Sequence, residues 1–194
     1  YGGASVGSIE KIKQIATNIK KLKKLQLVVV VSAMAGETDR LVGLINSLSK
    51  IPNEREYDQI ISTGERVSAG LLALALQSIN VKSITLDPFK LNLLTDNLHS
   101  KASIISVDVK EIRKNLKSNH VVIIPGFQGI NSDNEITTLG RGGSDLSAVA
   151  IAGALKADRC ELLKDDVDGV YTTDPRLYNK AKKIDYISYQ EMLE

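Results

Sequence analysis

The residues best suited to chemistry form a glycine-rich polar stretch ahead of an apolar, alanine-rich run. It reads Thr137-Thr138-Leu139-Gly140-Arg141-Gly142-Gly143-Ser144-Asp145. Arg141 offers a planar fork of N–H donors that matches a carboxylate or a phosphate. Glycines before a helix let the backbone approach such an anion, and the helix start adds favourable partial charge. A simple N-cap by Ser144 or Asp145 is the alternative, although a cap needs neither the arginine nor three glycines.

A second polar stretch, residues 164–176, mixes acidic, basic and aromatic side chains in the order K-D-D-V-D-G-V-Y-T-T-D-P-R. The spacing fails the EF-hand pattern, because that calcium loop needs a glycine at its sixth position and a glutamate at its twelfth. A nucleotide site agrees better, with the tyrosine for the base and the cations for the phosphates. A solvated surface loop is the alternative.

Two stretches of small and polar residues suit a compact polar ligand. Residues 32–38 (S-A-M-A-G-E-T) follow an apolar run, and Thr63-Gly64-Glu65-Arg66 lies inside a predicted helix. A glycine in mid-helix costs about 1 kcal/mol relative to alanine, so we expect a ligand or another segment to approach closely there. Glu65 could bind an ammonium group. The alternatives are an N-cap at Thr38 and a solvated Glu65 on an exposed helix face.

The N-terminal residues Tyr1-Gly2-Gly3 precede the first predicted helix. Glycines in that place let backbone N–H groups reach a phosphate. The stretch is not a Walker A loop, because Ser8-Ile9 follows where that loop has Lys-Ser/Thr. An ordinary glycine turn is the alternative.

Helices and strands alternate along the chain, and they must position these loops. Short β-branched or apolar runs at 27–31, 121–124 and 161–163 predict buried strands, and 81–86 predicts one more. Apolar spacing predicts helices over 9–22, 41–48, 57–77, 109–116 and 144–155, with short strands and loop over 89–108. The alternation predicts an α/β fold, a three-layer α/β/α sandwich around a mostly parallel central sheet. Ligands bind such sheets at the carboxyl ends of the strands.

Composition excludes several classes of protein. The 194 residues are 43% hydrophobic and 25% charged, as in soluble globular domains, and the net charge is only +2. This balance gives no reason to expect nucleic acid or a membrane as partner. One cysteine, Cys160, excludes a disulfide scaffold, and His99 and His120 cannot form a histidine-rich metal centre. No apolar run is long enough to span a membrane, and an intracellular, reducing compartment is expected.

Both ends of the sequence indicate that it is a part of a longer chain. It opens on Tyr1 rather than methionine, and it stops at Glu194, just after the capping-box pattern Ser188-x-x-Glu191. We therefore expect one domain, residues 1–194, that is incomplete at both ends.

Taken together, these motifs resemble the aspartate kinases of the amino-acid kinase family. The Arg-Gly-Gly-Ser-Asp, Ser-Ala-Met-Ala-Gly and Thr-Gly-Glu stretches point to aspartate kinases, whereas the last motif is shared loosely with glutamate 5-kinases and uridylate kinases. The matching stretches occur in the family's order and cover essentially the whole chain: residues 1–6, 32–36, 63–65, 126–129, 138–145 and 166–176.

The resemblance implies transfer of the ATP γ-phosphoryl group to the side-chain carboxylate of L-aspartate, giving 4-phospho-L-aspartate. That reaction begins lysine, threonine and methionine synthesis. The resemblance also implies Mg²⁺ carried on the ATP phosphates, a homo-oligomer in the cytoplasm, and ACT regulatory domains downstream. No protein ligand for the metal is indicated, and neither nucleic acid nor a membrane is an implied partner.

By resemblance, each motif residue acquires a role. The aspartate-binding residues are Ser32, Thr38, Glu65 and Arg141, and the catalytic residues are Ser144 and Asp145. The nucleotide-binding residues are Tyr1, Gly2, Gly3, Lys164, Asp165, Tyr171 and Arg176.

Some positions depart from the family pattern. A lysine normally precedes the Tyr-Gly-Gly stretch, a second lies beyond the helix predicted at Ser188, and Lys164 stands where threonine or serine is usual. The printed chain alone is therefore expected to fold but to transfer phosphate poorly. Glutamate 5-kinase, UMP kinase and an inactive aspartate-binding fragment remain as alternatives. Glu65 together with Arg141 favours an amino acid over a nucleotide as acceptor.

Overall fold

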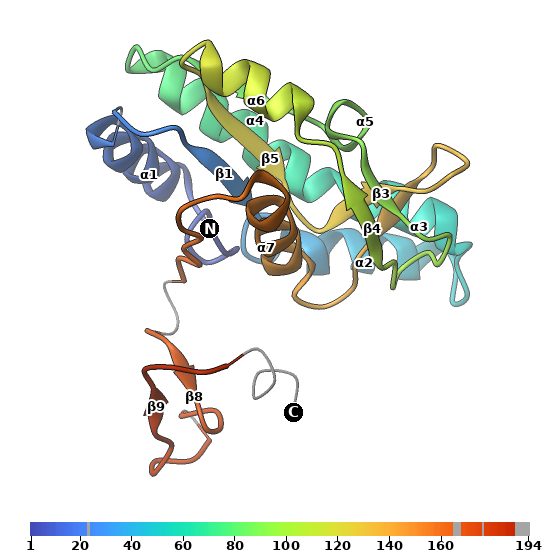
Figure 1. Ribbon diagram of the computed structural model, residues 1–194. Coiled ribbons are helices and arrows are strands. Elements are labelled where there is room, and N and C mark those ends of the chain that lie inside the picture. Colours follow the sequence, from blue (N-terminus) through green and yellow to red (C-terminus); the bar gives the residue numbers. More distant parts are fainter. Residues whose placement is uncertain (23, 165–167, 176, 189–194) are drawn as a thin grey trace. The chain divides into compact units, whose positions relative to one another are not determined.

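A computed structural model of the chain describes residues 1–22, 24–164, 168–175 and 177–188 (Figure 1). The chain divides into two units, Tyr1–Leu163 and Lys164–Glu194, and each is described by itself. Among the described residues, no helix combines the length and the apolar character that crossing a membrane requires.

A parallel three-stranded sheet, sheet A, forms the centre of the first unit. Its strands are β1 (Val28–Val31), β5 (Val121–Pro125) and β2 (Ser83–Thr85), in the order β1-β5-β2. Val29 of β1 lies opposite Ile123 of β5, and Ile84 of β2 lies opposite Val122. The predicted strands 27–31, 81–86 and 121–124 are thus confirmed.

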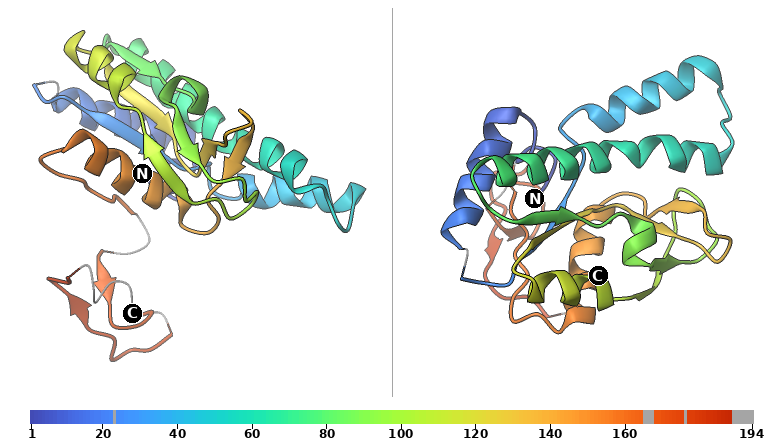
Figure 2. Two further views of the ribbon diagram at one scale, coloured as in Figure 1. Left: turned by 45° about the vertical axis from the view of Figure 1, so that its right-hand side comes forward. Right: turned by 90° about the horizontal axis from the view of Figure 1, so that it is seen from above.

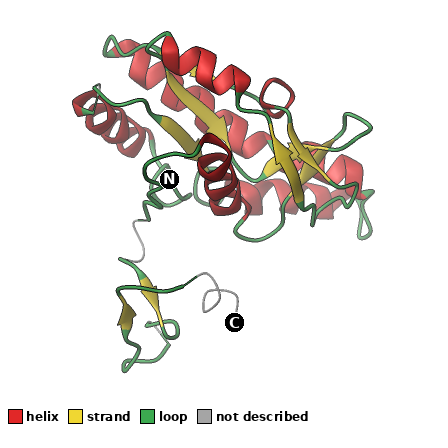
Figure 3. Ribbon diagram, viewed as in Figure 1, coloured by secondary structure: helices red, strands yellow, loops and turns green. Residues whose placement is uncertain are grey.

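Helices cover both faces of sheet A, because its β-branched side chains are buried in both directions. Val29, Val31 and Ile123 pack with α1 (Ile9–Lys21) and α4 (Thr63–Ser78). On the other face, Val122 and Ile124 join a core that includes residues of α6 (Lys110–Lys117) and α7 (Gly143–Leu155). Figure 3 shows the helices on either side of the strands, and the right view of Figure 2 shows α1 beside one end of α4. The three-layer α/β/α arrangement is confirmed.

A second sheet, sheet B, contains four strands, of which the sequence pattern predicts only those within residues 89–108. Its order is β4 (Ile104–Val107), β3 (Leu93–Thr95), β6 (Gln128–Ile130) and β7 (Ile136–Thr138). The β3–β6 pair is parallel, and the other pairs are antiparallel. A short helix, α5 (Pro88–Leu91), precedes β3. The Asn131 side chain shapes the β6–β7 turn, because its Oδ1 accepts the amides of Asp133 and Glu135.

The predicted single helix over 57–77 is wrong. The segment forms α3 (Glu54–Ile61) and α4, with a break at Ser62, and it follows α2 (Glu37–Leu48). The Asn53 side chain caps α3 by accepting the Glu56 amide, so this helix starts earlier than the apolar spacing indicated. Gly64 consequently lies in the first turn of α4 rather than in mid-helix.

The predicted buried strand at 161–163 is also wrong. These three residues have no regular secondary structure, and Leu162 and Leu163 are 49% and 41% exposed. A three-residue run needs a neighbouring strand to satisfy its backbone. Within the described residues it pairs with no strand, and the carbonyl of Leu163 instead accepts the amide of Gly2.

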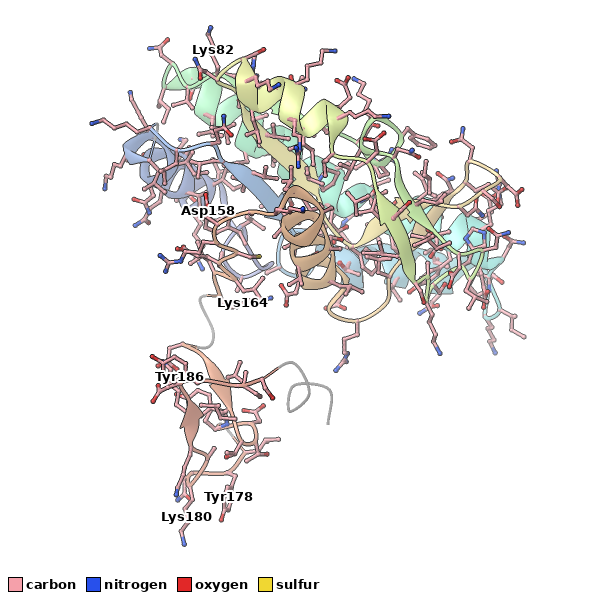
Figure 4. The ribbon with its side chains drawn as sticks, viewed as in Figure 1. Lys82, Asp158, Lys164, Tyr178, Lys180 and Tyr186 are labelled. Atoms are coloured by element: carbon pink, nitrogen blue, oxygen red, sulfur yellow. The ribbon has the colours of Figure 1, made fainter. Side chains whose placement is uncertain are left out.

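The second unit contains a two-stranded antiparallel ribbon, β8 (Val170–Tyr171) with β9 (Lys183–Ile184). Figure 4 shows Tyr178 and Lys180 near each other on the connection between these strands. The predicted capping box pairs Ser188 with Glu191, and Glu191 lies outside the described residues.

Candidate active site

The N-terminal segment runs alongside the loop that leaves β1. The amide of Ser32 donates to the carbonyl of Tyr1 (3.1 Å), and the amide of Ala35 donates to the carbonyl of Gly3 (3.2 Å). A Cβ atom on Gly3 would come within 2.9 Å of the Ala33 carbonyl oxygen. Glycine is therefore needed at this position for close backbone packing, whereas the amide of Gly2 already donates to Leu163.

The carboxyl end of β5 meets the start of α7 at Gly126. Its amide donates to the carbonyl of Val31 (3.0 Å), which ties the ends of β5 and β1 together. A Cβ atom on Gly126 would lie 2.9 Å from Cα of Ser144. The glycine thus lets the first turn of α7 approach the edge of the sheet where ligands usually bind.

Gly64 brings the starts of α4 and α2 to the same loop. A Cβ atom here would lie 2.8 Å from Cβ of Ala33 and 3.5 Å from Cγ of Glu37. Another segment does approach this glycine closely, but it does so through the Ala33 side chain of the loop after β1 rather than through a ligand or a backbone. The starts of α2, α4 and α7 therefore all lie at the carboxyl ends of β1 and β5.

Glu65, the third residue of α4, carries the strongest electrostatic signal in this region. Its side chain is buried, with the residue only 4% exposed. The alternative interpretation, a solvated Glu65 on an exposed helix face, is therefore wrong. One carboxylate oxygen, Oε1, accepts the amide of Ala33 at 3.1 Å. The other, Oε2, has no hydrogen-bond partner among the described residues. Burial raises the pKa of Glu65 to about 7, although the bond from Ala33 opposes this shift.

An under-satisfied buried carboxylate is costly, and such groups mark candidate binding sites. A cationic donor that reached Oε2 would supply the missing partner and favour the charged form. The geometry of Glu65 therefore suits an ammonium group better than an anion.

Two left-handed glycines, rather than polar side chains, cap the helices around the site. The N-cap of α2 is Gly36 (φ 80°), and the N-cap of α7 is Gly142 (φ 74°). The alternative readings of Thr38 and of Ser144 or Asp145 as N-caps are therefore wrong. These three residues lie in the first turns of their helices and are partly buried.

The remaining acceptor-site candidates lie on the same loops. Ser32 follows β1 and is partly buried, and Arg141 is exposed one residue before the N-cap of α7. Because it is exposed at the start of a helix, the guanidinium of Arg141 can form a bidentate pair with a carboxylate of a ligand.

Two buried polar residues outside the predicted set of site residues, Gln128 and Asp58, hold this region together. Gln128 is 1% exposed, and its Nε2 donates to the carbonyls of Ser62 (3.0 Å) and Gly126 (3.4 Å). The amide thus joins the start of α4 to the end of β5. Asp58 is 0% exposed and also joins separate segments. His99 belongs to the same cluster, because its Nδ1 lies 3.0 Å from Asp58 Oδ2.

The candidate nucleotide residues of the last motif belong to the second unit. The Tyr171 hydroxyl donates to Asp168 Oδ1 (2.7 Å), and Lys183 Nζ donates to the other oxygen of that carboxylate (2.9 Å). The ammonium of Lys183, followed by the Tyr171 hydroxyl, lowers the pKa of Asp168. Lys164 is partly buried, whereas Asp165 and Arg176 lie outside the described residues.

Comparison with known proteins identifies the fold family. The model of the amino acid kinase family matches residues 1–194. The chain belongs to the amino acid kinase family. An aspartokinase of Pseudomonas aeruginosa is 48% identical over 196 residues, and one of Helicobacter pylori is 53% identical over 196 residues. Both comparisons cover 100% of this chain but only 47% and 48% of the relative, so the chain spans about half the length of these kinases.

Solved structures of this family have the same fold. The aspartate kinase of Synechocystis has a TM-score of 0.76 and 47% identity, covering 93% of this chain and 30% of that one. Aspartokinase III of Escherichia coli, in complex with aspartate and ADP, has a TM-score of 0.81 and 26% identity, covering 95% of this chain and 52% of that one. The predicted α/β fold of amino-acid kinases is confirmed by these likenesses.

Proposed function

We propose that the protein is an aspartate kinase, which transfers the γ-phosphoryl group of ATP to the side-chain carboxylate of L-aspartate to give 4-phospho-L-aspartate. The observation that carries the proposal is Glu65, whose buried Oε2 lacks a partner among the described residues at the carboxyl edge of sheet A. The curated relatives at 48% and 53% identity, both aspartokinases, support the same activity.

In this proposal, the acceptor is held by opposite charges. Glu65 takes the α-ammonium group of aspartate, and Arg141 takes a carboxylate through a bidentate pair. Ser32 and Thr38 supply hydroxyl groups from the loop after β1 and from the first turn of α2. Glutamate would need the same charges at a greater separation, and UMP would have no ammonium group for Glu65.

The transfer itself needs no protein nucleophile, since the substrate carboxylate attacks the γ-phosphorus directly. The protein then contributes alignment and stabilisation of charge on the transferring group. Ser144 and Asp145 are the residues of the α7 start assigned to this step. Asp145 would orient cationic groups around the phosphoryl.

ATP is assigned to Tyr1, Gly2, Gly3, Lys164, Asp165, Tyr171 and Arg176, and the nucleotide complex of Escherichia coli aspartokinase III supports nucleotide use. Among the described residues, no group of three or more acidic, histidine or cysteine side chains could hold a metal ion. The resemblance to aspartate kinases implies that magnesium enters on the ATP phosphates, and we assign no step to a protein ligand for it.

The proposal also covers the compartment, the oligomeric state, the pathway and the domain organisation of the protein. The protein would act in the cytoplasm as a homo-oligomer, at the start of lysine, threonine and methionine synthesis. Residues 1–194 would form part of its kinase domain, with ACT regulatory domains downstream.

The test is ADP release by the complete gene product with aspartate, glutamate or UMP as acceptor. We expect turnover with aspartate at least tenfold above that with the other two. Equal or faster release with glutamate or UMP would replace the proposal by a related kinase activity. Aspartate binding without ADP release would indicate an inactive binding protein.

A further inference from the structure

Asp58 is a fully buried carboxylate at the meeting point of three segments. It lies on α3 and is 0% exposed. Its oxygens accept the amide of Ser100 (3.0 Å), the amide of Thr138 (3.1 Å) and the hydroxyl of Thr138 (2.6 Å). His99 Nδ1 lies 3.0 Å away. A buried carboxylate with this many donors is held firmly and holds its partners firmly in return.

Two of these partners support the turn that carries Arg141. Thr138 is the last residue of β7, three positions before the arginine. Ser100 lies under the same turn, because a Cβ atom on Gly140 would be 3.4 Å from its carbonyl oxygen. The turn itself is tight, since Gly140 has φ 74° and its carbonyl accepts the amide of Gly143. We therefore expect a displacement of Thr138 or Ser100 to move the turn that carries Arg141.

The backbone of Asp58 leads directly to Glu65. The carbonyl of Asp58 accepts the amide of Ser62 (3.1 Å), and Ser62 is the N-cap of α4. Glu65 follows in the first turn of that helix. One residue thus contacts both supports of the proposed acceptor site, the helix start with the carboxylate and the turn with the guanidinium.

We call the hydrogen bonds from the Thr138 amide and hydroxyl to Asp58 the Asp58–Thr138 clamp. We propose that this clamp is a positioning element that sets the separation between Glu65 and Arg141. It would thereby select the length of the amino acid that accepts the phosphoryl group. The inference rests on the proposed function, because it assumes that these two side chains hold the two ends of aspartate. A changed distance between the side chains of Glu65 and Arg141 weakens the binding of aspartate more than the binding of ATP. It also reduces the discrimination against glutamate, which is longer by one methylene group.

Two neighbouring threonines provide a matched pair of variants. Thr138→Val removes the hydroxyl that donates to Asp58 and leaves the backbone bond in place. Thr137→Val removes a hydroxyl of the same strand that lies 2.6 Å from the hydroxyl of Thr95, away from the clamp. Both threonines are 0% exposed, so each variant loses a buried hydroxyl, but only Thr138→Val removes a hydrogen bond to a charged group. Thr138→Ser keeps the hydroxyl donor and removes only the methyl group.

The experiment measures KM and kcat of the complete gene product for aspartate, glutamate and ATP. For Thr138→Val we expect the KM for aspartate to rise about tenfold and the preference for aspartate over glutamate to fall several-fold, because a hydrogen bond to a charged group is lost. The KM for ATP should stay within about twofold. Thr137→Val should leave the KM for both substrates within about twofold, and Thr138→Ser should recover most of the loss.

Equal effects of Thr138→Val and Thr137→Val on the aspartate KM would overturn the inference and leave the proposed function intact. Failure of the unmodified protein to use aspartate would overturn the proposed function instead. If Thr138→Val does not fold, Thr138→Cys tests the same contact, because a thiol of similar size is a much weaker donor to Asp58 than the hydroxyl. An aspartate KM unchanged by Thr138→Cys would then contradict the clamp.

Discussion

Asp58 and Glu65 are both buried carboxylates, seven residues apart on consecutive helices, and they differ in how they are satisfied. Asp58 accepts hydrogen bonds from two amides and two hydroxyls, with a histidine nitrogen at 3.0 Å. Glu65 accepts the Ala33 amide, and its Oε2 has no partner in the described part of the chain. A satisfied buried carboxylate stabilises the fold, whereas an under-satisfied one costs stability and is available to a ligand.

The largest expected effect is the loss of stability in Asp58→Ala. The substitution leaves the amides of Ser100 and Thr138 and the Thr138 hydroxyl without an acceptor in the interior. Each such group costs about 1–3 kcal/mol, so we expect the free energy of unfolding to fall by about 4–6 kcal/mol. Denaturant unfolding measures this. Asp39→Ala, at an exposed position of α2, should change stability by less than about 0.5 kcal/mol. A loss for Asp58→Ala as small as that of Asp39→Ala would show that the two buried carboxylates do not differ as described.

The second-largest effect that we expect is a loss of stability with rising pH, caused by the buried carboxyl group of Glu65. Its folded pKa of about 7 lies above the ordinary value of 4.5, so the unfolded chain releases this proton first. The contribution of Glu65 is therefore most favourable below about pH 4.5 and is lost as pH rises to about 7, a change of about 3 kcal/mol. In unfolding curves across this range, the unmodified protein should lose stability relative to Glu65→Gln. Parallel pH profiles of the two proteins would mean that the carboxylate of Glu65 is already well solvated or paired.

Arg141→Ala should have a smaller effect, confined to binding. Removal of one partner from a bidentate guanidinium–carboxylate pair costs roughly 2–3 kcal/mol of binding free energy. Because Arg141 is exposed, the free energy of unfolding should change by less than about 0.5 kcal/mol. Calorimetric titration with aspartate and with ATP separately checks both ligands. Unchanged aspartate affinity would remove Arg141 from the acceptor site and leave Glu65 without its proposed counterpart.

The sequence predicts part of the fold and of the surroundings of the two buried carboxylates. The apolar runs of β1 and β5 predicted a sheet buried on both faces, and Gly64 predicted a close approach beside Glu65. The seven-residue spacing between Asp58 and Glu65 places both on the buried stripe of a helical pattern, which was a usable signal that was missed. The number of donors around each carboxylate could not be predicted, because those donors come from loops and strands far away in the sequence.

The errors have local physical causes. The single helix over 57–77 was predicted because apolar periodicity continues across Ser62, whereas the structure interrupts the helix there. The strand at 161–163 was predicted from three apolar residues, but a strand forms only where a partner satisfies its backbone. The β6–β7 hairpin was missed, although Asn131 and the polar residues after it are typical of a turn.

The central claim is that Oε2 of Glu65 is the acceptor for a substrate ammonium group. Calorimetric titration of aspartate near pH 6, in buffers of different ionisation enthalpy, counts the protons released on binding. Glu65 is mostly protonated at that pH, so an ammonium group that binds its charged form must displace a proton. We predict release of nearly one proton per aspartate, falling toward zero near pH 8, and none for Glu65→Gln. Equal proton release by the unmodified protein and Glu65→Gln would contradict the account.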